Sequence, residues 1–371
     1  MTIPFLDLAA ASREVAADQS AAIERVLASG WYVLGPEVER FEREFAAPVG
    51  AAHCVGVANG LDALRLTLQA LGIGPGDEVI VPSHTFIATW LAVSATGARP
   101  VPVEPVDGSF VIGAAAVEAA IGARTAAILP VHLYGQPADM PALARLAARH
   151  SLALVADAAQ AHGAGVGGHP VGAWGDAASW SFYPAKNLGA LGDGGAITTD
   201  DAALAARLRR LRNYGSDRKY VHLEQGANSR LDELQAAILG VRLTRLEEWN
   251  ERRGTVAESY TALLRDCGLE LPPGPGAGDV HAWHLYVVRS RHRDDLAEAL
   301  RAAGVGSLVH YPIPCHRQGA YASSRVAATS LEIADRYAGQ VLSLPIGPHL
   351  AAEQVERVVR VVQSSNIAKA A

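Results

Sequence analysis

Residues 152–162 have the sequence LALVADAAQAH, an apolar run that ends in an aspartate, a glutamine and a histidine. The run from Leu152 to Ala156 predicts a buried strand, which places Asp157 at the strand's carboxyl end. Similar apolar runs occur on both sides of it in the chain, separated by segments with helical spacing. This alternation predicts an α/β fold with a mostly parallel sheet covered by helices.

The predicted strands are short apolar runs, and they span His53 to Val57, Glu78 to Pro82, Ala126 to Val131, Leu152 to Ala156, Ala178 to Phe182 and Gly195 to Thr199. The predicted helices between them span Leu61 to Leu71, Phe86 to Ala95 and Leu143 to His150. Turn residues such as Gly74-Pro75-Gly76-Asp77 separate helices from strands.

The pattern changes in the last third of the chain. A long helical stretch is expected from about Leu231 through Tyr260, and a proline- and glycine-rich segment, 272–276, then interrupts it. Beyond this point the expected elements are a strand over Trp283 to Val288 and helices over Asp294 to Ala303 and Ala352 to Gln363. We therefore expect a large domain of residues 1–245 and a smaller α+β domain of residues 246–371.

The composition argues against several kinds of binding partner. Only 19% of the 371 residues are charged and the net charge is −6, which does not fit a polybasic nucleic-acid surface or a disordered acidic tail. No stretch approaches the roughly 18 uncharged apolar residues of a membrane span, and the first residues lack a signal-peptide pattern. The three scattered cysteines and the histidines at 310 and 316 do not form a metal motif. We expect a soluble cytoplasmic protein without a metal.

Lysine is rare in this chain, which makes each lysine informative. Only Lys186, Lys219 and Lys369 occur among 32 lysine and arginine residues. An amine can form an imine with an aldehyde, and a guanidinium cannot serve in its place. Lys186 follows a predicted strand in the segment SFYPAKN, at a sheet edge where open α/β proteins bind ligands. A chance surface lysine is the alternative.

Two further segments fit a cofactor that carries a pyridine ring and a phosphate. A carboxylate buried at the end of a strand, Asp157, needs a cationic partner such as a protonated pyridine nitrogen; a helix cap is the alternative. Residues 57–64, VANGLDAL, predict a strand, a turn and a helix start, which suits phosphate binding or an ordinary Asn-capped helix. Phe86 follows another strand and either stacks on a flat ring or belongs to the core.

One apparent motif is set aside. Residues 163–168 match G-x-G-x-x-G letter by letter, but a dinucleotide-binding loop must lead directly into a helix. Here the next residues are His169-Pro170-Val171-Gly172, which predict a turn or hairpin.

Four motifs occur in the order typical of one enzyme family: N-G-L-D-A-L at 59–64, D-A-A-Q-A-H-G-A at 157–164, S-F-Y-P-A-K-N-L-G-A-L-G-D-G-G at 181–195 and N-S-R-L-D-E-L-Q-A-A-I-L at 228–239. With them the chain resembles the DegT/DnrJ/EryC1/StrS sugar aminotransferases over nearly its whole length. The resemblance implies the aspartate-aminotransferase fold, also called fold type I of enzymes that use pyridoxal 5'-phosphate, and a homodimer with shared active sites.

The resemblance also implies roles for single residues. Lys186 would form the imine with the cofactor aldehyde, and Asp157 would meet the pyridine nitrogen. The other implied cofactor ligands contact the phosphate, the ring or its hydroxyl, and they are Gly60, Leu61, Phe86, Gln160, Ser181 and Asn228. Of these, Asn228 would reach the phosphate from the other subunit. Many relatives have serine or threonine with glycine where this chain has Asn59-Gly60-Leu61.

Within the family, residues 131–140 and 309–314 look most like enzymes that aminate carbon 3 of dTDP-linked 3-oxo-6-deoxyhexoses, with glutamate as the amine donor. The residues that match positions near the sugar are Tyr183, Lys219, His310 and Tyr311. The alternatives are amination of carbon 4 or of another nucleotide sugar, a sugar dehydratase dependent on the same cofactor, and a non-enzymatic sensor. The related dehydratases carry histidine at the position of Lys186.

Overall fold

The computed structural model describes residues 2–322, 324 and 330–365, so Lys369 lies outside the described residues. A seven-stranded sheet forms the centre of the protein, with the strand order β1-β9-β8-β5-β4-β2-β3. In that order the strands are β1 (His53–Val57), β9 (Gly195–Thr199), β8 (Ala177–Ser181), β5 (Ala153–Asp157), β4 (Thr125–Ile128), β2 (Glu78–Pro82) and β3 (Arg99–Val103). β9 runs antiparallel to both of its neighbours, and the other strands share one direction. The predicted mostly parallel sheet is confirmed.

Each predicted strand of this sheet is present within a few residues of its expected bounds, but β3 was missed. Its sequence, RPVPV, alternates proline with valine, and proline cannot donate a hydrogen bond to a sheet ladder. β3 is the last strand in the sheet order and pairs only with β2 among the described strands. An edge position tolerates the missing donors, which explains why a proline-rich segment can still be a strand.

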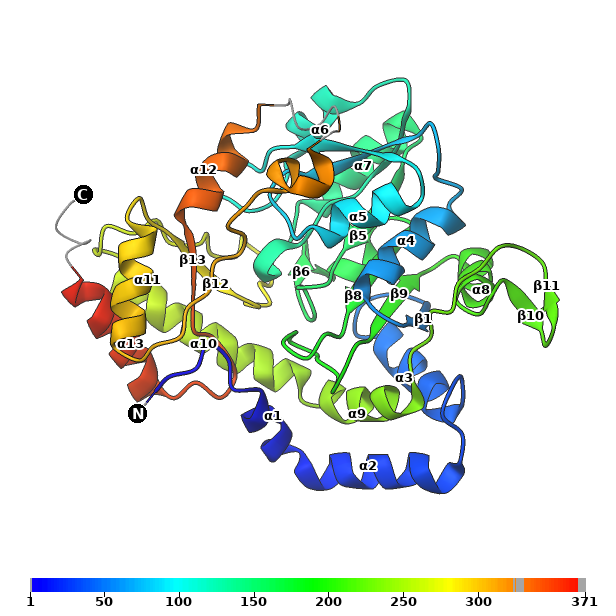
Figure 1. The fold of residues 1–371 in the computed structure, drawn as a ribbon, viewed down its shortest axis with the longest axis horizontal. Helices are drawn as coiled ribbons and strands as arrows, with labels where there is room; N and C mark the ends of the chain where they lie inside the picture. The colour runs from blue at the N-terminus through cyan, green and yellow to red at the C-terminus, as the bar shows by residue number, and fades with distance from the viewer. Residues whose placement is uncertain (1, 323, 325–329, 366–371) are drawn as a thin grey trace.

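Helices cover the sheet and continue into the C-terminal region (Figure 1). They are α1 (Leu8–Glu14), α2 (Ala16–Ser29), α3 (Pro36–Ala46), α4 (Gly60–Ala70), α5 (Ala88–Ala95), α6 (Ala114–Ala120), α7 (Met140–His150), α8 (Ala202–Leu211), α9 (Glu233–Leu243), α10 (Leu246–Leu264), α11 (Arg293–Ala302), α12 (Glu332–Gln340) and α13 (Ala352–Ser364). The single long helix expected from Leu231 through Tyr260 is wrong, because α9 and α10 are separate helices. Thr244 follows α9 and its hydroxyl bonds the carbonyl of Val241, a local contact that competes with continuation of the helix.

The C-terminal elements have an apolar cluster of their own. β12 (Tyr286–Arg289) pairs antiparallel with β13 (Val341–Leu344), and α10, α11 and α13 pack around this pair. In Figure 1 these elements lie to the left of the central sheet. Ile3 also belongs to this cluster, and its N–H donates to the Gly304 carbonyl at 2.9 Å. A domain boundary near residue 245 remains our proposal, with the first residues of the chain packed on the C-terminal part.

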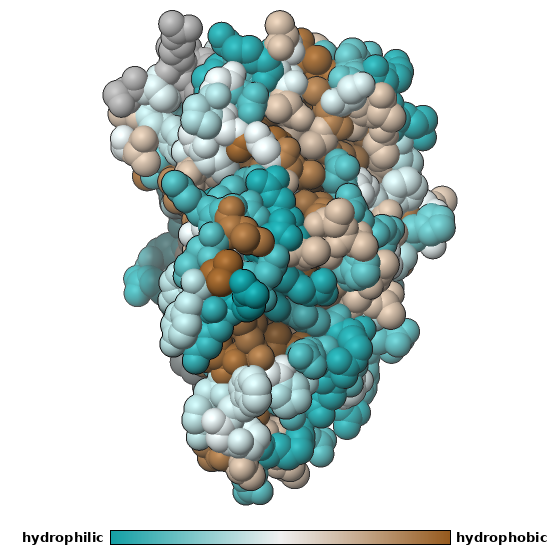
Figure 2. Space-filling model, turned by 90° about the vertical axis from the view of Figure 1, so that its right-hand side faces the viewer, coloured by the Kyte–Doolittle hydropathy of each residue, from teal (hydrophilic) through white to brown (hydrophobic). Residues whose placement is uncertain are grey.

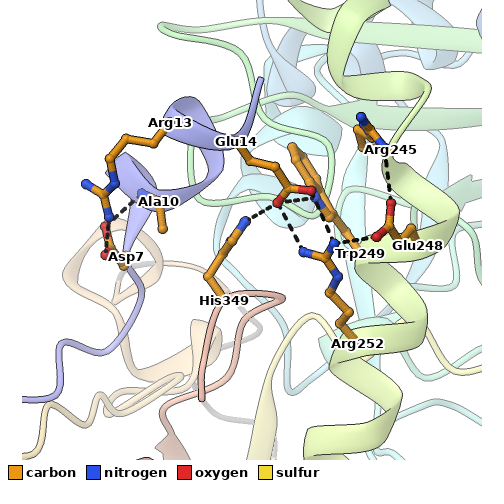
Figure 3. Close-up of polar contacts among 9 residues, drawn as sticks. All are labelled: Asp7, Ala10, Arg13, Glu14, Arg245, Glu248, Trp249, Arg252 and His349. Atoms are coloured by element: carbon orange, nitrogen blue, oxygen red, sulfur yellow. Dashed lines mark hydrogen bonds and ion pairs between the residues drawn. The ribbon is translucent and has the colours of Figure 1, made fainter. Parts of the chain in front are cut away.

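A polar cluster fixes α1 against α10 (Figure 3). The Glu14 carboxylate accepts hydrogen bonds from Trp249 Nε1 at 3.2 Å and from Arg252 at 3.1 Å. His349 contacts the same carboxylate from the loop before α13. These contacts join three parts of the chain that are far apart in sequence.

The structure also has two small hairpins. The first pairs β6 (Gly165–Val166), which is buried, with β7 (His169–Pro170), so the G-x-G-x-x-G match leads into a hairpin, as expected, and not into a helix. The second pairs β10 (Ser216–Arg218) with β11 (Val221–His222) and projects on the right of Figure 1. The face on that side carries apolar patches among polar ones (Figure 2). No helix in the described part of the chain is long and apolar enough to cross a membrane.

Candidate active site

A cavity of about 500 Å³ lies where the parallel strands end and the C-terminal elements meet the sheet. Its lining residues come from the ends of β1, β2, β4, β5 and β8 and the segments that follow them, and from the loops before β9, before β12 and after α11. They are Asn59, Gly60, Leu61, Leu64, Thr85, Phe86, Ala88, Val131, Leu133, Asp157, Ala159, Gln160, Ser181, Tyr183, Ala185, Lys186, Asp193, His284, Leu285, His310 and Tyr311. Ten of the twelve site residues expected from the sequence line this single cavity.

Lys186 lies on the loop after β8, which is held in place by hydrogen bonds on both sides of the lysine. The Lys186 N–H donates to the Tyr183 carbonyl at 2.8 Å, and the Asn187 amide donates to the Ala282 carbonyl at 2.7 Å. Loss of hydration lowers the pKa of Lys186 to about 8, although the nearby Asp157 carboxylate acts in the opposite direction. About a tenth of this amine is therefore uncharged at pH 7, far more than for a lysine with the ordinary pKa, which suits a nucleophile or a general base.

Asp157 ends β5 and is buried in the floor of the cavity. One carboxylate oxygen accepts from the Thr89 hydroxyl at 2.9 Å and the other from the Ala159 N–H at 3.1 Å. The alternative that Asp157 caps a helix is wrong, because no helix begins in residues 158–164. Burial raises the pKa of Asp157, and the two hydrogen bonds and Lys186 act against that effect. A buried carboxylate with this surrounding favours a cationic ligand group.

Gln160 is fixed with its amide nitrogen available as a donor. Its side-chain oxygen accepts from the Tyr134 N–H at 2.6 Å, and its nitrogen donates to the Tyr311 hydroxyl at 3.1 Å. The Tyr134 hydroxyl donates to the His310 carbonyl, so one tyrosine supports both Gln160 and the segment of Tyr311. The arrangement leaves one amide proton of Gln160 for a ligand oxygen.

The amino end of α4 lies in the cavity wall. Asn59 caps this helix by accepting the Asp62 N–H at 2.8 Å, so the capped-helix interpretation is correct, and Gly60 and Leu61 line the cavity beside it. N–H groups of a first helical turn have no acceptor within the helix and attract anions. Gly60 also permits close packing on Ser181, because a Cβ at position 60 would lie 2.7 Å from the Ser181 Cβ.

Aromatic side chains line the mouth of the cavity. Phe86 is 52% exposed, so the core interpretation is wrong, and its ring centroid lies 5.3 Å from that of Tyr311. Tyr183 is also exposed at the mouth. His310 hydrogen-bonds Ser343 through Nδ1 at 2.8 Å, and burial, helped by Lys186, lowers the pKa of His310 to about 4. His310 is therefore a neutral polar group near neutral pH.

Two expected site residues, Asn228 and Lys219, do not line the cavity of their own chain. Both are exposed. Lys219 lies at the tip of the β10–β11 hairpin, with its ammonium 5.1 Å from the centre of the Tyr220 ring. The described part of one chain therefore does not bring these two residues to the other ten.

Four residues in or beside the cavity escaped sequence reasoning: Thr85, Thr89, Tyr134 and His284. His284 lines the cavity and bonds Asn187 at 3.0 Å, and burial holds its pKa well below the usual value. No local pattern distinguished these residues, because Thr85 lies in the loop before α5 and only Thr89 is on that helix.

Comparison with known proteins indicates the same family as the sequence motifs. A model of the DegT/DnrJ/EryC1/StrS aminotransferase family matches residues 13–363. The erythromycin biosynthesis sensory transduction protein EryC1 of Saccharopolyspora erythraea is 58% identical over 365 residues, 98% of this chain and 100% of the relative. The dTDP-3-amino-3,4,6-trideoxy-alpha-D-glucose transaminase of Streptomyces venezuelae is 56% identical, over 97% of this chain and 95% of its own.

A solved structure is equally similar. The crystal structure of S. venezuelae DesV in complex with a ketimine intermediate aligns with a TM-score of 0.96 and 55% identity, and the alignment covers 98% of each chain. At this similarity the comparison concerns the whole chain and not one part of it.

Proposed function

We propose that the protein transfers the amino group of glutamate to carbon 3 of a dTDP-linked 3-oxo-6-deoxyhexose. The chain belongs to the DegT/DnrJ/EryC1/StrS aminotransferase family. The family is one of transaminases dependent on pyridoxal 5'-phosphate, and we infer the same cofactor here. The observation that carries the proposal is that Lys186 and Asp157, from the ends of neighbouring strands β8 and β5, line one cavity with the amino end of α4.

The cavity fits the cofactor at both ends. Asp157 is a buried carboxylate that favours a cationic partner, and a pyridinium nitrogen supplies one. The first turn of α4, with Gly60 and Leu61, offers N–H donors for a phosphate, and Ser181 lies directly beside it. Lys186 is the amine that would hold the aldehyde, and the mouth residue Phe86 would stack on the ring.

When bound, the cofactor accepts electrons from the substrate carbon that loses a proton. Asp157 would keep the ring nitrogen protonated throughout. The amine of Lys186, once released from the aldehyde, would move the proton from the glutamate carbon to the cofactor carbon and, in the second half-reaction, from the cofactor carbon to the sugar carbon, a role worth roughly two to four orders of magnitude in rate. Gln160 would donate its free amide proton to the ring hydroxyl, and glutamate would leave as 2-oxoglutarate.

We further propose a homodimer in which each site uses two chains. Asn228 and Lys219 are exposed and lie outside the cavity of their own chain, as expected if they serve the other chain's site. In this arrangement Asn228 would reach the phosphate, and Lys219 would approach the sugar nucleotide together with Tyr183, His310 and Tyr311 of the other chain. A cytoplasmic location belongs to the same proposal.

The rival functions differ at identifiable points. The related dehydratases carry histidine where this chain has Lys186, so that reading requires a residue that is absent at this position. A relative at 58% identity has a name that describes sensory transduction, and a sensor would bind ligand without turnover. Amination of carbon 4, or of another nucleotide sugar, requires only a different sugar pose in the same cavity.

One experiment separates these outcomes. The purified protein, loaded with pyridoxal 5'-phosphate, is incubated with glutamate and dTDP-linked 3-oxo- or 4-oxo-6-deoxyhexoses, and the products are analysed by mass spectrometry and NMR. We expect an amine at carbon 3 and one 2-oxoglutarate for each sugar aminated. An amine at carbon 4 would move the proposal to the alternative, and binding of both substrates without 2-oxoglutarate would support a sensor.

A further inference from the structure

The carboxylate of Asp157 is held by two donors of different kinds. The Ala159 N–H belongs to the backbone, and the Thr89 hydroxyl belongs to a side chain on α5. Among the described residues, Thr89 is the one side chain that hydrogen-bonds this carboxylate. Asp157 is 6% exposed and Thr89 is fully buried, so water does not substitute readily for the Thr89 hydroxyl.

The hydrogen-bond directions follow from proton counting. An ionised carboxylate only accepts, so the single Thr89 proton must point at Asp157. Thr85 lies 3.0 Å from Thr89, oxygen to oxygen, and must then donate its own proton to the Thr89 oxygen. This chain of two hydroxyls has one direction only while Asp157 is ionised. A donor that is itself hydrogen-bonded in this way is polarised and binds the carboxylate more strongly.

We propose that Thr89, supported by Thr85, is the positioning residue that keeps Asp157 ionised and aimed at the pyridine nitrogen. The inference rests on the proposed function, because it assigns Asp157 to that nitrogen. Burial disfavours the charged carboxylate, and three groups oppose this effect: the Ala159 N–H, the Thr89 hydroxyl and Lys186. Only Thr89 can be changed without touching the backbone or the imine-forming amine.

Other ionisable groups near Asp157 must be kept constant in any test. Lys186 favours the ionised carboxylate, and the charge on Asp157 raises the pKa of Tyr311, a smaller effect there than burial. Neither side chain hydrogen-bonds Thr89 among the described contacts. A change at position 89 therefore reaches them only through Asp157 or through a change in packing.

The first experiment measures Asp157 itself in the full-length protein without cofactor. The infrared band of the protonated carboxyl, identified by its loss in Asp157→Asn, is followed against pH in the parent and in Thr89→Val. A hydrogen bond to a charged group contributes about 1.5–3 kcal/mol, so we expect the pKa of Asp157 to rise by about one to two in Thr89→Val. Thr89→Ser should restore the parent value. Thr67→Val is the matched control, because Thr67 is fully buried and its hydroxyl donates to the Ala63 carbonyl and lies 3.4 Å from the Ser179 hydroxyl, without a hydrogen bond to Asp157 among the described contacts.

The second experiment uses the loaded enzyme and a double-mutant cycle. Thr89→Val should lower kcat by about tenfold or more with little change in KM, and should add less than about twofold in the Asp157→Asn background. An unchanged Asp157 pKa in both Thr89→Val and the smaller Thr89→Ala would overturn the proposal, as would full additivity with Asp157→Asn. The infrared titration needs no turnover, so it stands even if the substrate assignment fails.

Discussion

The floor of the cavity and the segment around the β10–β11 hairpin represent two different ways of building a site. In the floor, Asp157 and Gln160 are nearly inaccessible, and each is fixed by hydrogen bonds within the same chain. In the hairpin, Tyr220 is 83% exposed and Leu223 is 64% exposed. The single chain is enough to organise the floor. Asn228 and Lys219, in contrast, are exposed in the single chain, and under our proposal they complete the site of a second chain.

The largest expected effect is at the floor. Lys186→Ala should lose turnover entirely, because the variant has neither the imine-forming amine nor the amine that moves the proton. The parent, loaded with cofactor, is reduced with borohydride and mapped by peptide mass spectrometry, and the label is expected on Lys186. A label on Lys219 with Lys186 unmodified would contradict the assignment, because the imine-forming lysine would then lie in the hairpin and not in the floor.

The second effect concerns the charge in the floor. Asp157→Asn keeps the shape but has one acceptor oxygen for the two donors, the Thr89 hydroxyl and the Ala159 N–H, and it removes the negative charge that faces the ring nitrogen. We expect kcat to fall by about a hundredfold or more, as for the loss of other preorganised electrostatic groups. Cofactor affinity, measured by fluorescence titration, should change much less. Turnover close to that of the parent would show that Asp157 does not hold the ring nitrogen.

The third prediction tests whether Asn228 of one chain works with Lys186 of the other chain. Lys186→Ala chains and Asn228→Ala chains, each inactive or severely impaired alone, are unfolded together and refolded. Random pairing makes about half of the dimers hybrid, and each hybrid regains one site with both native residues, so recovery approaches about one quarter of the parent sites. Each variant refolded alone is the control. No recovery in proven hybrid dimers would mean that Asn228 serves its own chain.

The sequence predicts the floor better than the hairpin for a physical reason. Asp157 directly follows one apolar run and Lys186 lies four residues beyond another, and strand ends of a parallel sheet meet at one edge, so their proximity follows from local patterns. The role of Thr89 depends on how α5 packs beside β2 and β3 so that Thr89 reaches the end of β5, which no local pattern specifies. The break between α9 and α10 and the proline-rich strand β3 depend on single contacts and on sheet position. The site that Asn228 serves depends on a second chain, and only the family resemblance predicts it.

The fourth prediction concerns how the reaction of Lys186 with the cofactor depends on pH. Only the uncharged amine attacks the cofactor aldehyde, and its pKa of about 8 means that protonation removes it as the pH falls below 8. The rate at which cofactor-free protein takes up pyridoxal 5'-phosphate should be constant above about pH 9 and fall about tenfold per pH unit below 8. The rate is followed by visible absorbance. A rate that still rises steeply between pH 9 and 10 would indicate a lysine with an ordinary pKa.

The smallest effect is expected at the hairpin tip. Lys219→Ala removes one exposed cation that, in the proposed dimer, approaches the sugar nucleotide of the other chain. A single charge-assisted hydrogen bond corresponds to a change in KM for the sugar nucleotide of about tenfold, and kcat should change little because the cation is remote from the bond that forms. Arg218→Ala is the matched control, since Arg218 is an exposed cation in the adjacent position of the same hairpin and its loss tests general attraction. KM for glutamate serves as an internal reference, because glutamate carries no nucleotide. Equal changes in both variants, or in both substrates, would reduce Lys219 to a contributor of net charge. A selective change in the KM for the sugar nucleotide would make the hairpin, although exposed in one chain, a part of the binding site.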